Sequence, residues 1–225
     1  MTELELRSAP IPSIKRLPLY LRFLKARAEF GMASVSCTHI AQDMGTDPTQ
    51  VRKDLAITGI VGRPKVGYDV EELIDAIETF LGWKDASDAF LVGAGHLGTA
   101  LMGYQKLGSH GLRIVAAFDV DPAKIGTQIH GRKVLPTRDL PRLAHRMHLH
   151  IGVITTPDAG AQAAADLLVT AGILAIWNFT SVRLDVPPNV IVENADLTSG
   201  LAVLSSNLKA MLGLRETPAQ RSLTP

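Results

Sequence analysis

The sequence has 225 residues, of which 46% are hydrophobic, and its formal net charge at pH 7 is +1. This length and composition suit a folded chain with one large domain or two modest ones, and they exclude a disordered or strongly charged protein. Because the sequence shows no long apolar run and no signal-peptide pattern, we expect a cytoplasmic protein without a membrane partner.

The charge is unevenly distributed over the first third of the chain. Residues 11–68 carry nine lysines and arginines against four acids, whereas residues 69–78 carry five acids and no base. A basic segment of this kind is typical of a surface that binds nucleic acid, although exposed charge is more often only solvated. The helices and strands expected within the segment distinguish between these two interpretations.

Two helices are expected first in this basic segment. One should begin near Pro18, because proline suits a first turn, and end at Gly31, with apolar residues at i, i+4, i+7 and i+11 along one face. A second, short helix is expected between Ser36, as its cap, and Gly45. Cys37 lies at its start; as the one cysteine of the chain it cannot form an intrachain disulfide, and we expect a buried thiol.

A third helix is expected after Asp47, a good N-cap, with Pro48 at its first position and Gln50 placed as in a capping box. Val51 and Leu55 would face the core, which leaves the N-terminal end of the helix free to contact base edges and phosphates. On that end, Arg52 and Lys53 can neutralise phosphates, and Gln50 or Arg52 could contact a base. The side chains expected to bind DNA there are Thr49, Gln50, Arg52 and Lys53.

The segment GIVGRPKVGYDV, residues 59–70, places glycines around Arg63 and Lys65. This pattern favours a two-stranded β-wing whose basic tip, formed by Arg63 and Lys65, lies along a DNA groove. The short helix, the glycine turn, the capped basic helix and the wing together predict a winged helix-turn-helix domain over residues 1–82.

The segment SDAFLVGAGHLGTAL, residues 87–101, has the form of a dinucleotide-binding fingerprint, with an apolar strand, a G-x-G-x-x-G turn and a helix. Gly93 permits the tight turn, Gly95 lets the backbone approach a pyrophosphate, and Gly98 lets the helix pack closely on the strand. Backbone N–H groups at the helix start would bind the phosphates. The residues expected to contact the cofactor are Gly93, Ala94, Gly95, His96, Leu97 and Gly98.

A second strand, RIVAAFD, ends at Asp119, twenty-one residues after Gly98. Its carboxylate is placed to accept hydrogen bonds from the adenosine ribose and would repel a 2′-phosphate, so NAD(H) is favoured over NADP(H). Strands are also expected at LHIGVITTP and ILAIWNF with a helix between them, which predicts a parallel, doubly wound α/β sheet over residues 83–195. Ligands bind at the carboxyl ends of such strands, where the sequence places Thr155, Thr156, Pro157 and Asn178.

The sequence also bears on catalysis, on a different adenine ligand and on metal binding. A dehydrogenase would need catalytic groups, but Tyr104 starts no Tyr-x-x-x-Lys pair and little chain remains for a substrate domain, so we expect no enzyme. Coenzyme A remains a possible adenine ligand, since Asp119 argues for a ribose and not for a nicotinamide. A metal site at His145, His148 and His150 is not expected, because their spacing crosses from a helix end into a strand.

The last expected helix, over residues 196–213, carries leucines at heptad spacing. Such a seam ordinarily packs on its own domain, but it would also suit a homodimer, whose two-fold symmetry matches a palindromic DNA site. The tail at residues 214–225 has no packing signal and is expected to be disordered. The seam consists of Leu197, Leu201, Leu204, Leu208 and Met211.

With SIKRLPLYLRFL, TQVRKDLAITG, VGYDVEEL, VGAGHLGTAL, AAFDVDPAKIG, AIWNFTSVRLDVP and VENADL in order, residues 11–212 resemble the Rex family of bacterial redox-sensing transcriptional repressors. The resemblance implies a homodimer whose winged-helix domains bind pseudo-palindromic double-stranded operator DNA and whose Rossmann domains sense the NADH/NAD+ ratio. NADH is preferred over NAD+, because a positive nicotinamide ring is costly in an apolar cleft, and it would release the DNA.

The resemblance also implies roles for particular residues. The last helix would be exchanged between subunits, with Leu197 beside the nicotinamide where some relatives place an aromatic residue. Arg16, Tyr104 and Asp196 would form the switch, with Asp196 paired across the dimer to Arg16 in one state and to Tyr104 in the other. Arg16 would also lie near the DNA, and Tyr104 near the cofactor. The wing differs from many relatives in the proline of GRPKVGY.

Overall fold

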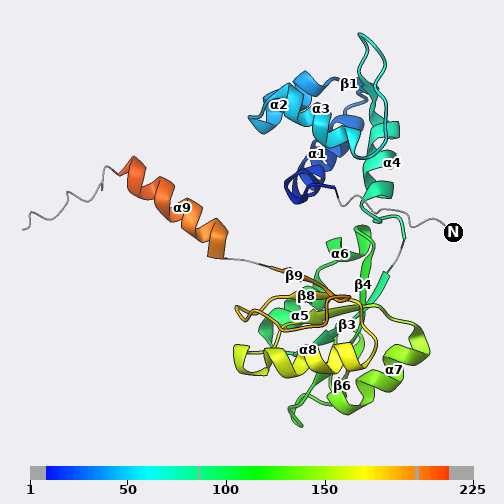
Figure 1. Cartoon of the computed structure of the whole chain (residues 1–225), viewed down its shortest axis with the longest axis vertical. Helices are drawn as coiled ribbons and strands as arrows, with labels where there is room; N and C mark the ends of the chain where they lie inside the picture. The colour runs from blue at the N-terminus through cyan, green and yellow to red at the C-terminus, as the bar shows by residue number, and fades with distance from the viewer. Residues whose placement is uncertain (1–8, 86, 196–197, 213–225) are drawn as a thin grey trace, which may run out of the picture. The chain divides into compact units, whose positions relative to one another are not determined.

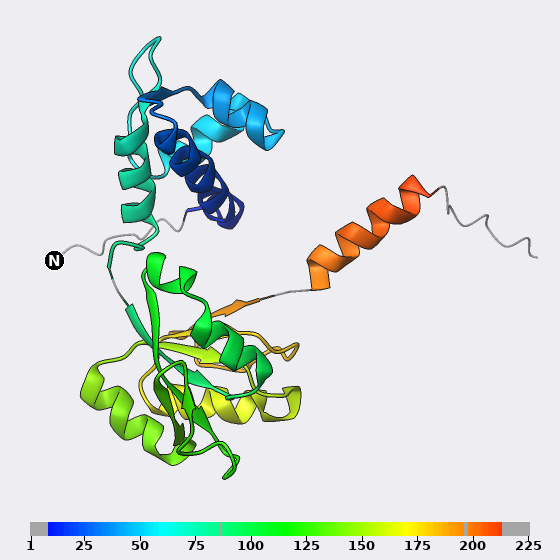
Figure 2. The same cartoon turned by 180° about the vertical axis from the view of Figure 1, so that it is seen from behind.

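The computed structural model describes residues 9–85, 87–195 and 198–212, and Figures 1 and 2 show it from opposite sides. The chain divides into two compact units. The first ends at Ala86 and also takes in Lys106–Leu112, whereas the second consists of Ser87–Gln105 and the chain from Arg113 onward. The short segment returns to the first unit through Trp83, whose ring meets that of His110 edge to face, with centroids 4.2 Å apart.

The first unit is helical, with a small antiparallel sheet. Its core contains the fully buried Leu17, Leu24, Val51, Leu55 and Ile77, which come from three different helices. Burial of these side chains is the main force that joins the helices. In chain order the elements are α1 (Ile11–Glu29), β1 (Ser34–Val35), α2 (Cys37–Met44), α3 (Pro48–Ala56), β2 (Tyr68–Asp69) and α4 (Val70–Phe80), with α6 (Lys106–Ser109) added later in the chain.

The predicted caps of α2 and α3 are confirmed. The Ser36 hydroxyl accepts a hydrogen bond from the His39 amide at 3.2 Å, and Gly45 ends the helix with φ of 62°. The Asp47 carboxylate accepts from the Thr49 amide at 2.7 Å and so starts α3. These local bonds satisfy amides that a helix end otherwise leaves without partners, which is why the two short helices begin and end as the sequence indicates.

The predicted start of α1 is wrong by two turns. The helix begins at Ile11, after Pro10, and Pro18 lies inside it. A proline inside a helix loses one backbone hydrogen bond and crowds the preceding turn. The cost is offset because Leu17 and Leu24 on either side of Pro18 lie on one continuous face that is fully buried.

The predicted wing is shorter than expected. Strand β2 pairs with β1, with Val35 opposite Tyr68, and the basic tip is closed by one antiparallel bridge between Arg63 and Gly67. Gly67 has φ of 94°, and a β-carbon there would lie 2.9 Å from the Val35 carbonyl carbon. Glycine at this position allows the backbone to approach β1 this closely.

The second unit is a seven-stranded sheet with the order β5-β6-β4-β3-β7-β8-β9. From β6 onward this is the doubly wound arrangement that the sequence predicts, with β3 and β7 meeting at the point where the strand order reverses. Strand β3 pairs with β7, β4 with β6, β7 with β8 and β8 with β9 in parallel, whereas β5 pairs with β6 antiparallel. Its strands are β3 (Ser87–Val92), β4 (Leu112–Asp119), β5 (Gln128–Ile129), β6 (Arg132–Pro136), β7 (Ile151–Ile154), β8 (Ala175–Asn178) and β9 (Ile191–Asn194).

Helices cover both faces of this sheet. The rings of Phe90 and Phe118 meet edge to face, with centroids 4.8 Å apart, on the face of the sheet against which α7 and α8 pack (Figure 1). The neighbouring Leu91 points to the other side and meets Gly98 of α5, which Figure 2 shows on that face. Alternate residues of one strand thus reach opposite cores. The helical elements are α5 (His96–Gly103), η1 (Thr137–Asp139), α7 (Leu140–Met147), η2 (Asp158–Gly160), α8 (Ala161–Thr170) and α9 (Thr198–Met211).

Candidate nucleotide and nucleic-acid sites

The glycine loop after β3 is locked against the loop after β7. Gly93 has φ of 105°, and a β-carbon on it would lie 2.7 Å from the Thr156 amide nitrogen. The Thr155 hydroxyl donates to the Gly93 carbonyl oxygen at 2.7 Å, and a β-carbon on Gly98 would lie 2.8 Å from that hydroxyl. Both glycines are therefore required by protein contacts at the switch point of the sheet.

Gly95 differs from these two glycines, because nothing lies within 4 Å of where its β-carbon would be. It stands at the N-cap of α5, and no side chain caps that helix. A helix start with uncapped amides and open space beside it suits an anionic ligand such as a pyrophosphate. Next to it, Leu97 is 36% exposed and His96 is exposed as well.

Asp119, at the end of β4, is 7% exposed and fully engaged with its own unit. One carboxylate oxygen accepts from the Ala94 amide at 2.8 Å and from the Lys124 ammonium at 3.1 Å, and the other accepts from the Asp121 amide at 2.9 Å. Burial raises the pKa of Asp119, but these bonds outweigh burial and lower it. Asp119 therefore fixes the glycine loop, and Lys124 is a partner that the sequence reasoning missed.

The other residues predicted at the strand ends are placed differently. Thr156 Oγ1 is buried and has no hydrogen-bond partner among the described residues, whereas Pro157 is exposed. The Asn178 amide group donates to the Val182 carbonyl oxygen and to the Asn194 side chain, and its oxygen accepts from the Thr180 amide and hydroxyl. Because these bonds use the capacity of the amide, Asn178 holds the loop after β8, and its contact with a cofactor stays a prediction.

Tyr104 is 52% exposed and forms the C-cap of α5. The helix is only eight residues long, so the glycine loop and Tyr104 stand at opposite ends of one short rigid element. Asp196 and Leu197 lie outside the described residues, as does the tail from residue 213 onward. No residue of α9 is buried, and Leu201, Leu204 and Leu208 are 61%, 65% and 51% exposed.

In the first unit, a buried carboxylate organises the residues near α3. Asp54 is fully buried and accepts from Arg16 Nε at 2.6 Å, Arg16 Nη2 at 2.8 Å and the Tyr20 hydroxyl at 2.7 Å. It also accepts from the Gln50 amide at 2.8 Å. Burial raises the pKa of Asp54, but the bonds from Arg16, Tyr20, Ser13 and Gln50 prevail and lower it to about 2.

This cluster changes how two predicted residues are placed. Gln50 binds the buried carboxylate of Asp54, one turn ahead, in place of the capping-box bond expected at Asp47, because a charged acceptor binds more strongly. The ion pair with Asp54 raises the pKa of Arg16 further above its usual range and ties that side chain to α3. Sequence reasoning missed Asp54: its position three residues after Val51 places it on the inner face of α3, but its partners Arg16 and Tyr20 come from α1 and no local pattern indicates them.

The remaining predicted DNA contacts lie on the surface. Thr49, Arg52 and Lys53 are exposed along the first turns of α3, as expected for a helix that binds in a groove. At the wing tip Lys65 is exposed, with φ of 63°, and Arg63 makes an exposed ion pair with Glu72 at 3.3 Å. A pair this exposed contributes little to stability, so Arg63 can exchange it for a phosphate.

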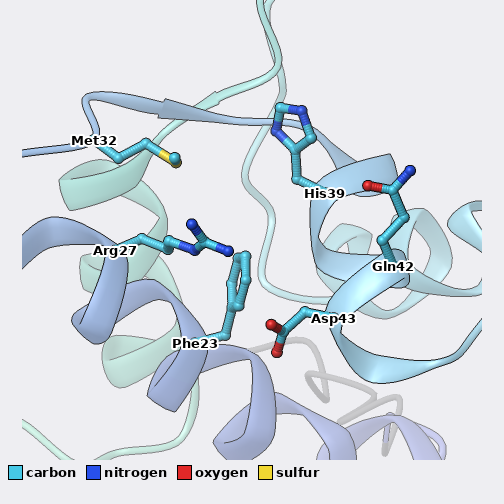
Figure 3. Close-up of a pocket in the computed structure, with 6 residues that line it drawn as sticks. All are labelled: Phe23, Arg27, Met32, His39, Gln42 and Asp43. Atoms are coloured by element: carbon cyan, nitrogen blue, oxygen red, sulfur yellow. The ribbon is translucent and has the colours of Figure 1, made fainter. Parts of the chain in front are cut away.

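Figure 3 shows a pocket of about 450 Å³ in the same unit. The Arg27 guanidinium lies over the Phe23 ring, 5.1 Å from its centroid, as in a cation–π contact. None of the residues predicted to contact DNA lines this pocket. Its lining consists of Phe23, Arg27, Met32, His39, Gln42 and Asp43.

Two further features concern metals and membranes. Among the described residues, no group of three or more His, Cys, Asp and Glu side chains is arranged to hold a metal ion. The rings of His145 and His148 are 6.5 Å apart, and they do not form such a group with His150. Within the same residues, no helix has both the length and the apolar character needed to span a bilayer.

Family models match two parts of the sequence. Residues 9–56 match "Putative DNA-binding protein N-terminus", and residues 84–182 match "CoA binding domain". A relative from Treponema denticola, named "Redox-sensing transcriptional repressor Rex", is 50% identical over 193 residues, which are 86% of this chain and 92% of the relative. A relative of the same name from Bacteroides thetaiotaomicron is 40% identical over 206 residues, or 92% of this chain and 94% of the relative.

Solved structures agree over the same length. The structure is similar to that of RSP in complex with beta-NAD+ and operator DNA, with a TM-score of 0.86, 31% identity, and coverage of 95% of this chain and 99% of that chain. It is also similar to RSP in complex with beta-NADH, with a TM-score of 0.84, 32% identity, and coverage of 92% and 97%. RSP is described as a Rex-family repressor.

Proposed function

Because the chain belongs to the Rex family of redox-sensing transcriptional repressors, we propose that it binds operator DNA as a homodimer and releases it when NADH binds. The observation that carries this proposal is similarity over nearly the whole chain to one repressor solved both with NAD+ and operator DNA and with NADH. The family's activity is regulatory, and the chain is not an enzyme. Since a repressor acts where the chromosome is, we place it in the cytoplasm.

The first unit would supply the DNA contacts. The exposed Arg52 and Lys53 of α3 and Lys65 of the wing are suited to phosphates, and Thr49 stands beside them. Arg16 and Gln50 would act mainly through Asp54, which ties α1 to α3 and so fixes the direction of the recognition helix. Two such units related by two-fold symmetry would match a pseudo-palindromic operator.

The second unit would bind NAD(H). The open space at Gly95, the uncapped start of α5, the ionised Asp119 and the unpartnered hydroxyl of Thr156 fit a pyrophosphate and an adenosine ribose. Bound NAD(H) supplies the redox signal, since the nicotinamide ring is positively charged only when oxidised. An apolar dimer cleft around that ring would favour NADH over NAD+.

The homodimer rests on α9. Leu201, Leu204 and Leu208 of this helix are more than half exposed, and the described part of the chain buries none of its residues. Exchange of α9 between two subunits would cover these leucines and bring Asp196 of each subunit toward the other chain. With the switch residues Arg16 and Tyr104, this exchange would link the state of the cofactor to the spacing of the DNA-binding units.

Coenzyme A is the second candidate ligand, because residues 84–182 match a CoA-binding family model. Coenzyme A carries a 3′-phosphate on its ribose, and the ionised Asp119 would repel that phosphate as it would a 2′-phosphate. NAD(H) carries no phosphate on either hydroxyl, so the carboxylate favours it.

One titration tests the proposal. Operator affinity of the full chain is measured by fluorescence anisotropy, first without ligand and then with saturating NADH, NAD+ or coenzyme A. We expect NADH to weaken operator binding about 5- to 150-fold, the usual range of allosteric coupling, and NAD+ to do so much less. Operator binding that NADH leaves unchanged would refute the proposal, and release by coenzyme A alone would select the second ligand.

A further inference from the structure

The C-terminal end of α5 is held by a part of the chain that has no role in the function described so far. The β5–β6 hairpin turns through His130 and Gly131, with Ile129 paired to Arg132. Both turn residues have positive φ, 47° and 76°, as a two-residue hairpin turn of type I′ requires. Glycine or asparagine is usual at the first of these positions, and a histidine there is uncommon.

The side chains of this hairpin contact the last turn of α5. Arg132 Nη1 donates to the Met102 carbonyl oxygen at 2.8 Å. A β-carbon on Gly103 would lie 2.7 Å from His130 Cε1, so the imidazole covers the glycine directly. Tyr104 is the next residue. Its backbone therefore leaves α5 directly after the last helical turn, which the hairpin contacts at both Met102 and Gly103.

The same hairpin is continuous with the predicted ribose site. Lys124, which pairs with Asp119, accepts at its carbonyl oxygen from the Thr127 amide at 3.0 Å. Val134 of β6 donates in turn to the Thr127 carbonyl oxygen at 2.9 Å. Hydrogen bonds thus connect the segment from Asp119, at the predicted ribose site, to the hairpin, whose side chains contact α5 just before Tyr104.

We propose that the β5–β6 hairpin sets the direction of Tyr104, with His130 and Arg132 as positioning residues for the response to NADH. This inference rests on the proposed function, in which Tyr104 belongs to the switch. Helix α5 is held by the glycine loop at its start and by the hairpin at its end, so it can adopt few arrangements. A shift at the nucleotide-binding end is therefore passed to the end that carries Tyr104. His130 fills this role better than asparagine because its ring reaches Gly103.

The central experiment replaces His130 by asparagine. Asparagine accepts the left-handed conformation and favours the type I′ turn, so His130→Asn keeps the hairpin while removing the ring from Gly103. Operator affinity is measured with and without saturating NADH, and the ratio of the two affinities is the readout. We expect the ratio to fall about two- to thirtyfold from the wild-type value, the range seen when coupling residues are changed.

Two further variants complete the test. Arg132→Met removes the bond to the Met102 carbonyl and should lower the ratio in the same way, whereas Arg132→Lys should restore part of it. Lys133→Gln is the matched control, because Lys133 is an exposed residue of the same strand. It should leave the ratio within about twofold of wild type, as a surface substitution away from contacts usually does.

A purely structural measurement checks the contact itself. Gly103→Ala should lower the melting temperature by pushing the imidazole aside, and the loss should shrink in the His130→Asn background, where the space is free. If the losses in melting temperature from Gly103→Ala and His130→Asn simply add, the two residues do not interact and the contact is refuted.

The outcomes separate this inference from the proposed function. If wild-type chain does not respond to NADH, the proposed function fails, and this inference falls with it. If wild type responds and both His130→Asn and Arg132→Met respond equally well, only the positioning role is overturned. NADH affinity of the variants is also measured without DNA. If weaker NADH binding alone explains the smaller ratio of operator affinities, the positioning role is overturned, because the hairpin would then serve NADH binding and not the response.

Discussion

The Thr155 hydroxyl donates a hydrogen bond to the Gly93 carbonyl oxygen at 2.7 Å and so joins the loops that follow β3 and β7. These strands meet where the sheet reverses its order, so the bond spans the crevice in which doubly wound folds bind nucleotides. Gly93 and Gly98 have no space for a β-carbon beside this bond, whereas Gly95 has open space. The three glycines of one motif therefore separate into two that shape the fold and one that leaves open space at the predicted pyrophosphate site.

Gly95→Ala should weaken NADH binding about tenfold or more, because a methyl group would displace the pyrophosphate from the amides at the start of α5. The fold should be unaffected, since the φ of Gly95 is −85° and no atom lies near the added methyl. Gly98→Ala is the contrasting variant and should lower stability by about 1 to 3 kcal/mol through overpacking. NADH fluorescence titration and thermal melting check the pair; an equal loss of stability in both would contradict this separation.

Asp119→Asn should also reduce NADH affinity, by about ten- to a hundredfold, because a charge-assisted bond to the ribose becomes a neutral one. The same change weakens the bond that holds the Ala94 amide and removes the ion pair with Lys124. Lys124→Met tests the ion pair alone and keeps the carboxylate. Calorimetric titration with NADH checks both variants, and an unchanged affinity in Asp119→Asn would move the ribose elsewhere.

Much of the fold follows from local sequence signals. The caps at Ser36 and Asp47 and the strand that ends at Asp119 depend on neighbouring residues alone, and each was predicted with its physical reason. The glycine motif was similarly predictable, because a tight turn and a close packing contact each require glycine at a fixed spacing.

Contacts between distant segments were not predictable in this way. Asp54 is buried because Arg16 and Tyr20, from a helix more than thirty residues earlier, supply its partners, and no pattern near Asp54 reveals them. The continuous core around Leu17 likewise carries α1 through Pro18 against the local preference. Lys124 and the His130 contact depend on how β4 and the hairpin fold back, which spacing along the chain does not state.

Arg52→Ala should weaken operator binding and reduce the slope of log affinity against log salt by about 1, as expected when one phosphate contact is lost. Arg52 is exposed on α3, so its side chain can be shortened without disturbing the buried core. Arg22→Ala is the control, because Arg22 is equally exposed but lies on α1, outside the predicted DNA contacts. Anisotropy titrations at several salt concentrations measure the slope for each variant. The same slope of log affinity against log salt in both variants would place the recognition surface elsewhere.

Asp54→Asn should destabilise the chain by about 3 kcal/mol at neutral pH, because it removes the charge that balances Arg16 inside the first unit. The folded-state pKa of Asp54 is about 2, below its ordinary value, so this contribution is present above pH 4. It is lost as the pH falls from about 4 through about 2, and below that range the carboxylate is protonated in both states. Urea unfolding of wild type and variant should therefore give a difference that shrinks over that window; a constant difference would show that charge is not the cause.

If the chain forms the proposed homodimer, Leu204→Asp should leave it monomeric, because it places a charge in the middle of the α9 seam that the partner would cover. Leu204 is 65% exposed within its own chain, so the substitution costs the folded monomer little, and thermal melting of each unit should change slightly. Ser206→Asp is the matched control, since it adds the same charge to the same helix away from the seam. Sedimentation velocity measures the outcome. A dimeric Leu204→Asp variant would show that the seam does not hold the subunits together, whereas a monomeric one that also loses operator affinity would show that two DNA-binding units must act in pairs.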